Sequence, residues 1–240
     1  MIKGFQLAVL ILAAISGCTK KAATSPAKNS NPIQTTMTTD SLSYLALGDS
    51  YTIGESVSQN QSFPYQLRAA LDSASIAVKQ PLIIATTGWT TDNLINAIAN
   101  SGIIGKKYDF VTLLIGVNDQ YQGLSQGNYQ VKFAQVLNTA INFAGGDTSH
   151  VFVLSIPDYG VTPFAGGNDS TIGPQIDQFN AINKAASLKA GVHYIDITDI
   201  SRQAASDPAL IAPDGLHPSA KMYGLWIQRL EPIVAARIKN

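Results

Sequence analysis

The chain has 240 residues, enough for one domain with a full hydrophobic core once an export segment and a tail are set aside. Lys and Arg number 16, as do Asp and Glu, and only 13% of the residues are charged. This balance argues against nucleic acid as a partner, because nucleic acids are bound through basic patches. The single cysteine excludes an intramolecular disulfide, and the sequence contains no zinc-binding spacing and no phosphate-binding P-loop.

Residues 1–18 read MIKGFQLAVLILAAISGC and have the layout of a secretory signal peptide. Lys3 gives a positive start, an apolar run covers residues 5–15, and small residues precede the break. The apolar run is shorter than the roughly 20 residues that a membrane-spanning helix needs. A short N-terminal anchor helix is the alternative interpretation.

The segment 15–18, ISGC, resembles a bacterial lipobox, and the only cysteine of the chain falls at its end. The resemblance implies cleavage before Cys18 and lipidation of Cys18, which predicts an exported lipoprotein anchored at the cell envelope rather than spanning a membrane. The alternative is plain secretion with an unrelated cysteine. Residues 19–40 are rich in Thr, Ser, Ala, Lys and Asn without apolar periodicity, which predicts a disordered tether before a domain over 41–240.

Within that domain, apolar segments typical of buried strands alternate with amphipathic segments typical of helices. The predicted strands are 42–47, 81–85, 109–115, 150–156 and 192–197. Helices are expected from Pro64 onward and over 93–100, 128–143, 175–190 and 219–239, the last with a kink at Pro232. A long loop containing Gly and Pro is expected to run to Pro174. The alternation predicts a three-layer α/β/α fold with a five-stranded parallel sheet.

Small and polar residues follow the first three predicted strands and precede the last helix. They include Ser50, Gly88 and Asn118, and then Asp214 and His217. The carboxyl ends of parallel strands meet at one edge of a sheet, where open α/β folds build their sites. The sequence therefore predicts that these five residues gather at that edge.

A serine hydroxyl becomes a nucleophile when a base lies within hydrogen-bond reach and a third group orients that base. Of the three histidines, His150 opens a strand at the far edge and His193 lies inside a strand. His217 alone is expected in a loop at the site edge, and Asp214 precedes it by three residues, close enough to face the imidazole. The alternative is that residues 49–50 merely cap a helix and that residues 214–215 form an ordinary turn.

Attack on an ester carbonyl creates an oxyanion that needs preorganised N–H donors. Asn118 can supply a side-chain amide, and Gly88 and Ser50 can supply backbone N–H groups. Asn and Gly are also common turn formers, so each is weak evidence alone. A second serine, Ser125, lies in a GLSQG segment that fits the G-x-S-x-G nucleophile elbow. That elbow must follow a strand directly, and the preceding strand is expected to end near residue 115, which favours Ser50.

The blocks Gly48-Asp49-Ser50, Gly88, 116–119 (GVND) and 214–217 (DGLH) resemble, in order and spacing, the four blocks of the SGNH hydrolases, also called GDSL esterases/lipases. The resemblance covers residues 44–232. It implies Ser50 as nucleophile, His217 as general base and then acid, and Asp214 as its orienting partner. It also implies an oxyanion hole of Ser50, Gly88 and Asn118, a flavodoxin-like sheet of order 2-1-3-4-5, and no metal or organic cofactor.

These features predict a serine ester hydrolase that forms an acyl-enzyme on a small-molecule ester. Lysophospholipids, short-chain esters and acetylated carbohydrates all occur as substrates in the resembled family, and the sequence leans towards small or soluble esters because no lid element is evident. The alternatives are a carbohydrate O-acetyl esterase of the cell envelope and a non-catalytic envelope-binding lipoprotein. The oligomeric state stays open at this point.

Overall fold

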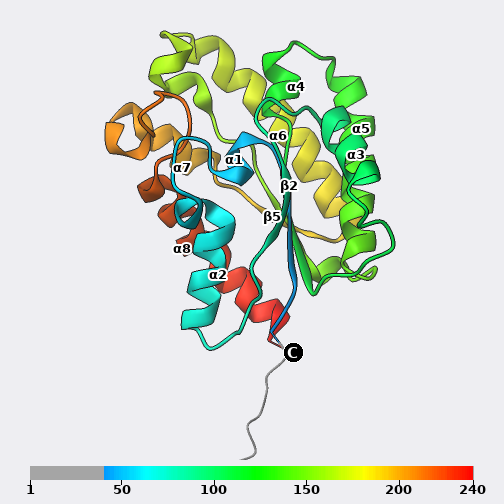
Figure 1. Ribbon diagram of the computed structural model, residues 1–240. Helices are drawn as coiled ribbons and strands as arrows, with labels where there is room; N and C mark the ends of the chain where they lie inside the picture. Colours follow the sequence, from blue (N-terminus) through cyan, green and yellow to red (C-terminus); the bar gives the residue numbers. More distant parts are fainter. Residues whose placement is uncertain (1–40, 240) are drawn as a thin grey trace, which may run out of the picture. The chain divides into compact units, whose positions relative to one another are not determined.

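The computed structural model describes residues 41–239, which contain a single five-stranded parallel sheet (Figure 1). The strand order is β2-β1-β3-β4-β5, which confirms both the predicted α/β fold and the order implied by the family resemblance. The strands are β1 (Tyr44–Gly48), β2 (Leu82–Ala85), β3 (Phe110–Leu114), β4 (Val151–Leu154) and β5 (His193–Ile195). The predicted signal peptide over 1–18, the lipidation of Cys18 and the tether over 19–40 lie outside the described residues.

The sheet is apolar on both faces at its centre because helices cover both sides. Every residue of β1, β3 and β4 is buried. In β1, Leu45 pairs with Leu82 of β2 on one side and with Val111 of β3 on the other. Because β1 lies between two parallel neighbours, the residues that follow it lie at the carboxyl end of the sheet.

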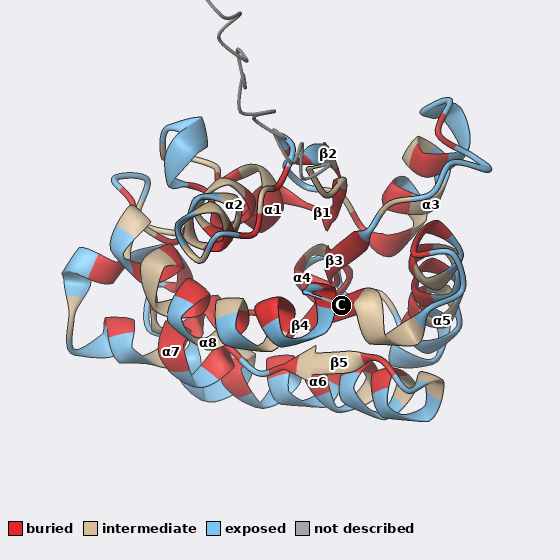
Figure 2. Cartoon of the chain, turned by 90° about the horizontal axis from the view of Figure 1, so that it is seen from below, coloured by how far each residue is buried: buried red, intermediate tan, exposed pale blue. Residues whose placement is uncertain are grey.

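Two groups of helices cover the sheet, with α2 and α8 against one face and α3, α5 and α6 against the other (Figure 1). In Figure 2 the central strands β1, β3 and β4 and the inward helix faces are buried, whereas the edge strands β2 and β5 are only partly buried and the outward helix faces are exposed. The helices are α1 (Ser50–Ile53), α2 (Phe63–Ser73), α3 (Thr91–Asn100), α4 (Val117–Tyr121), α5 (Gln126–Phe143), α6 (Asp169–Ala190), α7 (Thr198–Arg202) and α8 (Ala220–Ile238). Of the helices in residues 41–239, none has the length and hydrophobicity to cross a membrane.

Short 3₁₀ turns complete the connections between these elements. They are η1 (Gln59–Gln61), η2 (Thr148–His150), η3 (Tyr159–Val161), η4 (Pro163–Ala165), η5 (Gln203–Ala205) and η6 (Pro208–Leu210). His150 therefore ends a turn instead of opening β4 as expected. The prediction of a loop up to Pro174 was wrong in its second half, because α6 already begins at Asp169 and contains Pro174. Pro174 is close to the start of the helix, where a missing N–H removes only one early hydrogen bond.

The turn after β3 depends on Gly116, whose backbone has φ +129°, a conformation that favours glycine. A Cβ at this position would lie 2.2 Å from the hydroxyl of Tyr129 and 2.8 Å from Cδ1 of Ile156. Tyr129 cannot easily yield, because its buried hydroxyl donates to the carbonyl of Ile115 (3.0 Å) and bonds Asn183 (2.5 Å).

We therefore expect Gly116→Ala to lower the free energy of unfolding by about 2–4 kcal/mol, combining backbone strain with overpacking. Gly123→Ala is the matched control, because Gly123 also has a positive φ (+68°) but an added Cβ would meet no atom within 4 Å. Chemical denaturation of both variants should show the larger loss for Gly116→Ala. Equal losses would mean that the contact with Tyr129 relaxes without cost.

Candidate active site

Ser50 stands at the first turn after β1, where strand and helix meet almost without a loop. β1 ends at Gly48 and α1 begins at Ser50, with Asp49 as the N-cap that accepts the Tyr51 N–H at 3.0 Å. A Cβ on Gly48 would lie 2.0 Å from Oγ1 of Thr52, so only glycine fits at the strand end. The capping interpretation thus holds for Asp49. It does not hold for Ser50, whose hydroxyl faces His217.

Ser50, His217 and Asp214 form one continuous chain of hydrogen bonds. Nε2 of His217 lies 2.9 Å from Oγ of Ser50, and Nδ1 lies 2.6 Å from Oδ2 of Asp214. His217 reaches this position from the loop before α8, although 167 positions separate it from Ser50 in the sequence. The structure therefore brings together the three residues that the sequence singled out, in the order that nucleophile, base and orienting carboxylate require.

Four hydrogen-bond donors surround the carboxylate of Asp214. Oδ1 accepts the backbone N–H groups of Leu216 and His217, both at 3.0 Å, and Oδ2 accepts the Ser56 hydroxyl at 2.7 Å beside the imidazole. Partial burial by itself would raise the pKa of Asp214, but these hydrogen bonds outweigh it and hold the pKa well below its usual range. The carboxylate is thus ionised and is available only as an acceptor.

The three expected oxyanion donors lie around the same opening. Tyr51 donates its N–H to the side chain of Asp49, and the next N–H groups of α1 bond the Asp49 carbonyl, which leaves the Ser50 N–H for a ligand among the described hydrogen bonds. Nδ2 of Asn118 donates one hydrogen to the carbonyl of Trp89 at 3.0 Å, so its second hydrogen remains for an oxyanion. Gly88 has φ +80° and open space around its Cα, so its conformation rather than a lack of room calls for glycine.

Ser50 and His217 open into one pocket with a volume of about 120 Å³. Aromatic side chains form much of its wall: Tyr121, Tyr159 and Phe164 contact one another with ring centroids 6.0–6.3 Å apart. The residues that line the pocket are Ser50, Tyr51, Thr87, Gly88, Val117, Asn118, Tyr121, Tyr159, Phe164, Leu216 and His217. This lining contains no Lys or Arg, so the pocket suits a neutral ligand.

Two buried carboxyl groups, those of Asp49 and Asp119, lie next to the site residues Ser50 and Asn118 in the sequence. Asp49 is completely buried, and burial raises its pKa to about 8, so the group is largely uncharged at neutral pH. An uncharged Asp49 avoids placing a negative charge beside the Ser50 N–H. Burial also raises the pKa of Asp119, which accepts the N–H (2.9 Å) and hydroxyl (2.6 Å) of Thr91 and so ties α4 to the start of α3.

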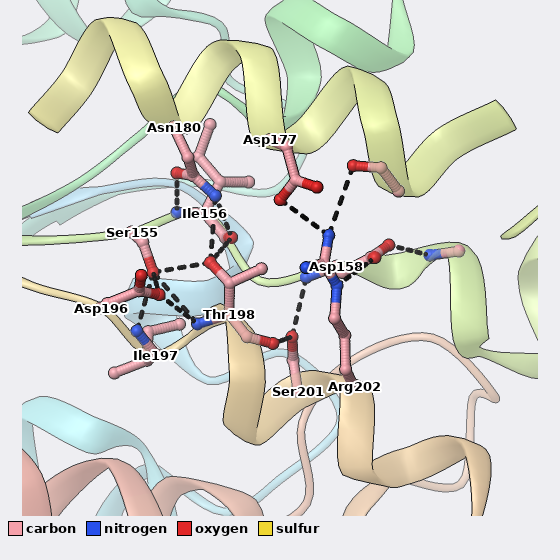
Figure 3. Close-up of polar contacts among 12 residues, drawn as sticks. Ser155, Ile156, Asp158, Asp177, Asn180, Asp196, Ile197, Thr198, Ser201 and Arg202 are labelled. Carbon is pink, nitrogen blue, oxygen red and sulfur yellow. Dashed lines mark hydrogen bonds and ion pairs between the residues drawn. The ribbon is translucent and has the colours of Figure 1, made fainter. Parts of the chain in front are cut away.

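A polar network near the ends of β4 and β5 holds the loop that carries Tyr159 and Phe164, two of the three aromatic residues of the pocket wall (Figure 3). Oδ1 of Asp158 accepts the Gly160 N–H at 2.8 Å and caps η3, while Oδ2 accepts Nε of Arg202 at 2.9 Å. Arg202 in turn bonds Asp177 of α6 at 2.8 Å. The side-chain amide of Asn180 accepts the N–H of Ile156 and donates to the carbonyl of Ile156, just after β4 (Figure 3).

The other candidates from the sequence lie elsewhere. Ser125 is the exposed N-cap of α5, accepting the N–H of Asn128 at 3.2 Å, and does not follow a strand. His193 lies in β5 and stacks on Phe152, and His150 bonds the carbonyl of Arg237. Within residues 41–239, no group of three or more His, Cys, Asp or Glu side chains is placed to hold a metal ion.

Sequence reasoning missed Ser56 and Thr91, which bond the site carboxylates directly. Neither stands in a recognisable motif, and Ser56 is separated from Asp214 by 158 positions. A serine in a turn is too common to single out without knowing which carboxylate it faces.

Comparison with known proteins now places the chain. Residues 46–225 match the model of the GDSL-like lipase/acylhydrolase family, which covers most of the chain. The chain belongs to this family. It is therefore a carboxylic ester hydrolase, in agreement with the resemblance seen in the four sequence blocks. No curated protein sequence matches it significantly.

Solved structures share the fold of this GDSL-like protein at low sequence identity. TesA has a TM-score of 0.62 and 16% identity over 80% of this chain and 97% of its own. The esterase EstA from Pseudoalteromonas sp. has a TM-score of 0.62 and 16% identity, covering 83% and 100%. The acetylxylan esterase Axe2 from Geobacillus stearothermophilus has a TM-score of 0.61 and 16% identity, covering 83% and 94%.

Proposed function

We propose that this GDSL-like protein hydrolyses small, neutral carboxylic esters through an acyl-enzyme on Ser50. One observation carries the proposal: the hydrogen-bonded chain from Ser50 through His217 to Asp214 ends at the wall of a pocket that also contains Asn118 and Gly88. A serine hydroxyl within reach of an oriented imidazole, facing a space with oxyanion donors, has the geometry of nucleophilic acyl transfer.

In the first half of the reaction, Oγ of Ser50 attacks the ester carbonyl while Nε2 of His217 accepts the hydroxyl proton. Asp214 holds the imidazole by Nδ1 and stabilises the imidazolium that forms. The Ser50 and Gly88 N–H groups and the free hydrogen of the Asn118 amide stabilise the oxyanion. Collapse of this intermediate breaks the ester C–O bond, and the leaving alcohol takes the proton from His217.

In the second half, a water molecule replaces the alcohol. His217 accepts a proton from this water as it attacks the acyl-enzyme, and then returns the proton to Oγ of Ser50 as the carboxylic acid leaves. The same donors meet the second oxyanion. The reaction needs no group beyond these side chains and water.

The dimensions and charge of the pocket favour a short acyl group. Its volume is about 120 Å³, and an apolar cavity of roughly 150 Å³ holds a ligand the size of benzene. The lining contains no cation that would pair with an anionic head group. A carbohydrate O-acetyl ester, the alternative substrate, also has a small acyl group, and the fold is shared with an acetylxylan esterase. A non-catalytic binding protein is less well supported, because such a role predicts a damaged triad.

We further propose that the enzyme is an exported bacterial lipoprotein, with the signal peptide over 1–18, the lipidated Cys18 and a tether over 19–40 leading to the hydrolase domain. Support comes from the sequence alone, from the lipobox-like ISGC segment and the polar composition that follows it. Mass spectrometry of the protein from membranes of the producing bacterium would detect a diacylglyceryl group on Cys18, and an unmodified N-terminus would contradict this assignment.

The substrate proposal predicts the order of rates in a series of p-nitrophenyl esters. We expect kcat/KM for the acetate and butyrate to exceed that for the octanoate by about tenfold or more, because each methylene that does not fit costs binding energy in the transition state. Spectrophotometric release of p-nitrophenol by the purified protein measures this order. A maximum at dodecanoate or beyond would contradict the short acyl pocket, and release of acetate from acetylated xylooligosaccharides at a higher kcat/KM would favour the carbohydrate alternative.

A further inference from the structure

The turn that follows α1 reaches two other parts of the site. Gly54, with φ +78°, ends α1 in a left-handed conformation, and its N–H donates to the carbonyl of Ser50. The next residue, Glu55, accepts the hydroxyl of Thr87, which lines the pocket beside Gly88. Ser56 then donates its hydroxyl to Oδ2 of Asp214 at 2.7 Å. Residues 55 and 56 therefore connect the Ser50 turn to the segment around Gly88 and to the loop before α8.

Ser56 donates to the same carboxylate oxygen of Asp214 that binds the imidazole of His217. Oδ1 of Asp214 is already saturated by two backbone N–H groups of its own turn. Oδ2 accepts Nδ1 of His217, and Ser56 is the second donor to that same atom. The hydroxyl thus limits rotation of the carboxylate and shares the negative charge that faces the imidazole.

The backbone of Ser56 is held in a costly conformation. In residues 41–239 only Ser56 (φ +65°) and Ser75 (φ +64°) combine a side chain with a positive φ. Residues other than Gly, Asn and Asp rarely adopt this region, and they persist in it where the surroundings impose it. Glycine would relieve the strain at position 56, yet it has no hydroxyl to donate to Asp214.

We propose that Ser56 is a positioning residue of the reaction, acting through Asp214 to hold the imidazole of His217 in line with Ser50. This inference rests on the proposed serine mechanism. Without the hydroxyl, the more basic and less constrained carboxylate attracts the imidazolium more strongly and orients the neutral imidazole less well. Activity should therefore fall, and the acid limb of its pH profile should move to higher pH.

Other charges near Asp214 do not account for such a shift. Tyr51 and Tyr223 are the buried titratable groups that sense its charge, and burial raises the pKa of both well above the ordinary value, so they stay neutral. Asp49 is buried and its pKa is raised to about 8, so it titrates on the alkaline side of the acid limb, and it is the same residue in the wild type and in the Ser56 variants. Glu55, which accepts the Thr87 hydroxyl, is likewise unchanged in the Ser56 variants, so it cannot cause a difference between their pH profiles and that of the wild type.

The test compares Ser56→Ala and Ser56→Gly with Ser75→Ala and Ser75→Gly. Ser75 is an exposed matched control with the same backbone conformation, two residues past the end of α2 and not part of the pocket lining. We expect both Ser56 variants to lose about tenfold in kcat, as for one hydrogen bond to a charged group. KM should stay within about twofold, because no substrate contact is removed. The Ser75 variants should retain wild-type kcat.

The pair at position 56 separates a structural role from a positioning role. Glycine adopts a positive φ without strain, whereas alanine does not. If the Ala variant lost activity only because its strained turn shifts, Ser56→Gly would keep the wild-type kcat. That result would overturn the proposal. An unchanged acid limb of kcat/KM against pH in both variants would also overturn it. Wild-type turnover that depends on Ser50 but not on Ser56 would refute this inference alone, whereas turnover that does not depend on Ser50 would refute the proposed mechanism with it.

Discussion

Ser50→Ala is expected to lower kcat by on the order of 10⁶-fold, the loss typical of removing the nucleophile from a serine hydrolase triad. Oγ of Ser50 is the only atom of the described site that lies within hydrogen-bond distance of Nε2 of His217 and also lines the pocket. The fold should survive, because the backbone of α1 is held by Asp49 and not by the Ser50 hydroxyl. Circular dichroism and thermal unfolding of the variant should match the wild type.

Ser125→Ala is the matched control for this loss. Ser125 occupies the GLSQG segment that fits a nucleophile elbow, but the structure uses its hydroxyl as the N-cap of α5. Its removal should cost about 1 kcal/mol of stability and leave kcat unchanged. A fluorophosphonate probe should label Ser125→Ala and fail to label Ser50→Ala. Labelling of Ser50→Ala but not of Ser125→Ala would identify Ser125 as the nucleophile and contradict our assignment.

The contrast between these two serines shows what sequence can predict about the site. A strand buried on both faces needs a continuous apolar run, so β1 and its end at Gly48 are visible without a structure. Ser125 is preceded by α4 and a turn rather than by a strand, and this difference in context also follows from the residues. The gathering of Ser50, Asn118 and His217 at one edge then follows from parallel α/β topology, whereas the strand order was implied only by the family resemblance.

Long-range side-chain contacts and local helix boundaries could not be predicted from the sequence patterns. Hydrogen bonds such as Ser56 to Asp214 and Thr91 to Asp119 depend on how separate turns face one another, which no local pattern encodes. The early start of α6 was missed because Pro174 is typical of a helix start, and here it stands inside the first turns. Likewise, α4 (Val117–Tyr121) is too short for apolar periodicity to reveal.

Those contacts also determine how Asn118 is presented. It stands at the start of α4, which Asp119 ties to Thr91 at the start of α3. Its amide donates to the carbonyl of Trp89, the residue after Gly88. The two side-by-side donors of the proposed oxyanion hole are thus held by one short set of hydrogen bonds, so the donors need little reorganisation when the oxyanion forms.

Asn118→Ala is accordingly expected to lower kcat by roughly 10²- to 10³-fold, the loss seen when one oxyanion donor is removed. KM should change little, because the ground-state carbonyl is bound less strongly than the oxyanion. Asn118→Asp should be at least as damaging, since a carboxylate of the same shape replaces a donor with a negative charge facing the oxyanion. Steady-state kinetics on p-nitrophenyl acetate measures both variants.

Gln122→Ala provides the matched control for Asn118. The Gln122 amide, one turn further along, contacts the carbonyl of Gly88 at 3.4 Å but does not line the pocket. Loss of this neighbouring amide should leave kcat within about twofold of the wild type, because it removes no donor to the reacting atoms. A comparable loss in both variants would indicate that the Asn118 effect arises from loosening of the Gly88 turn, and an unchanged rate in Asn118→Ala would remove Asn118 from the oxyanion hole.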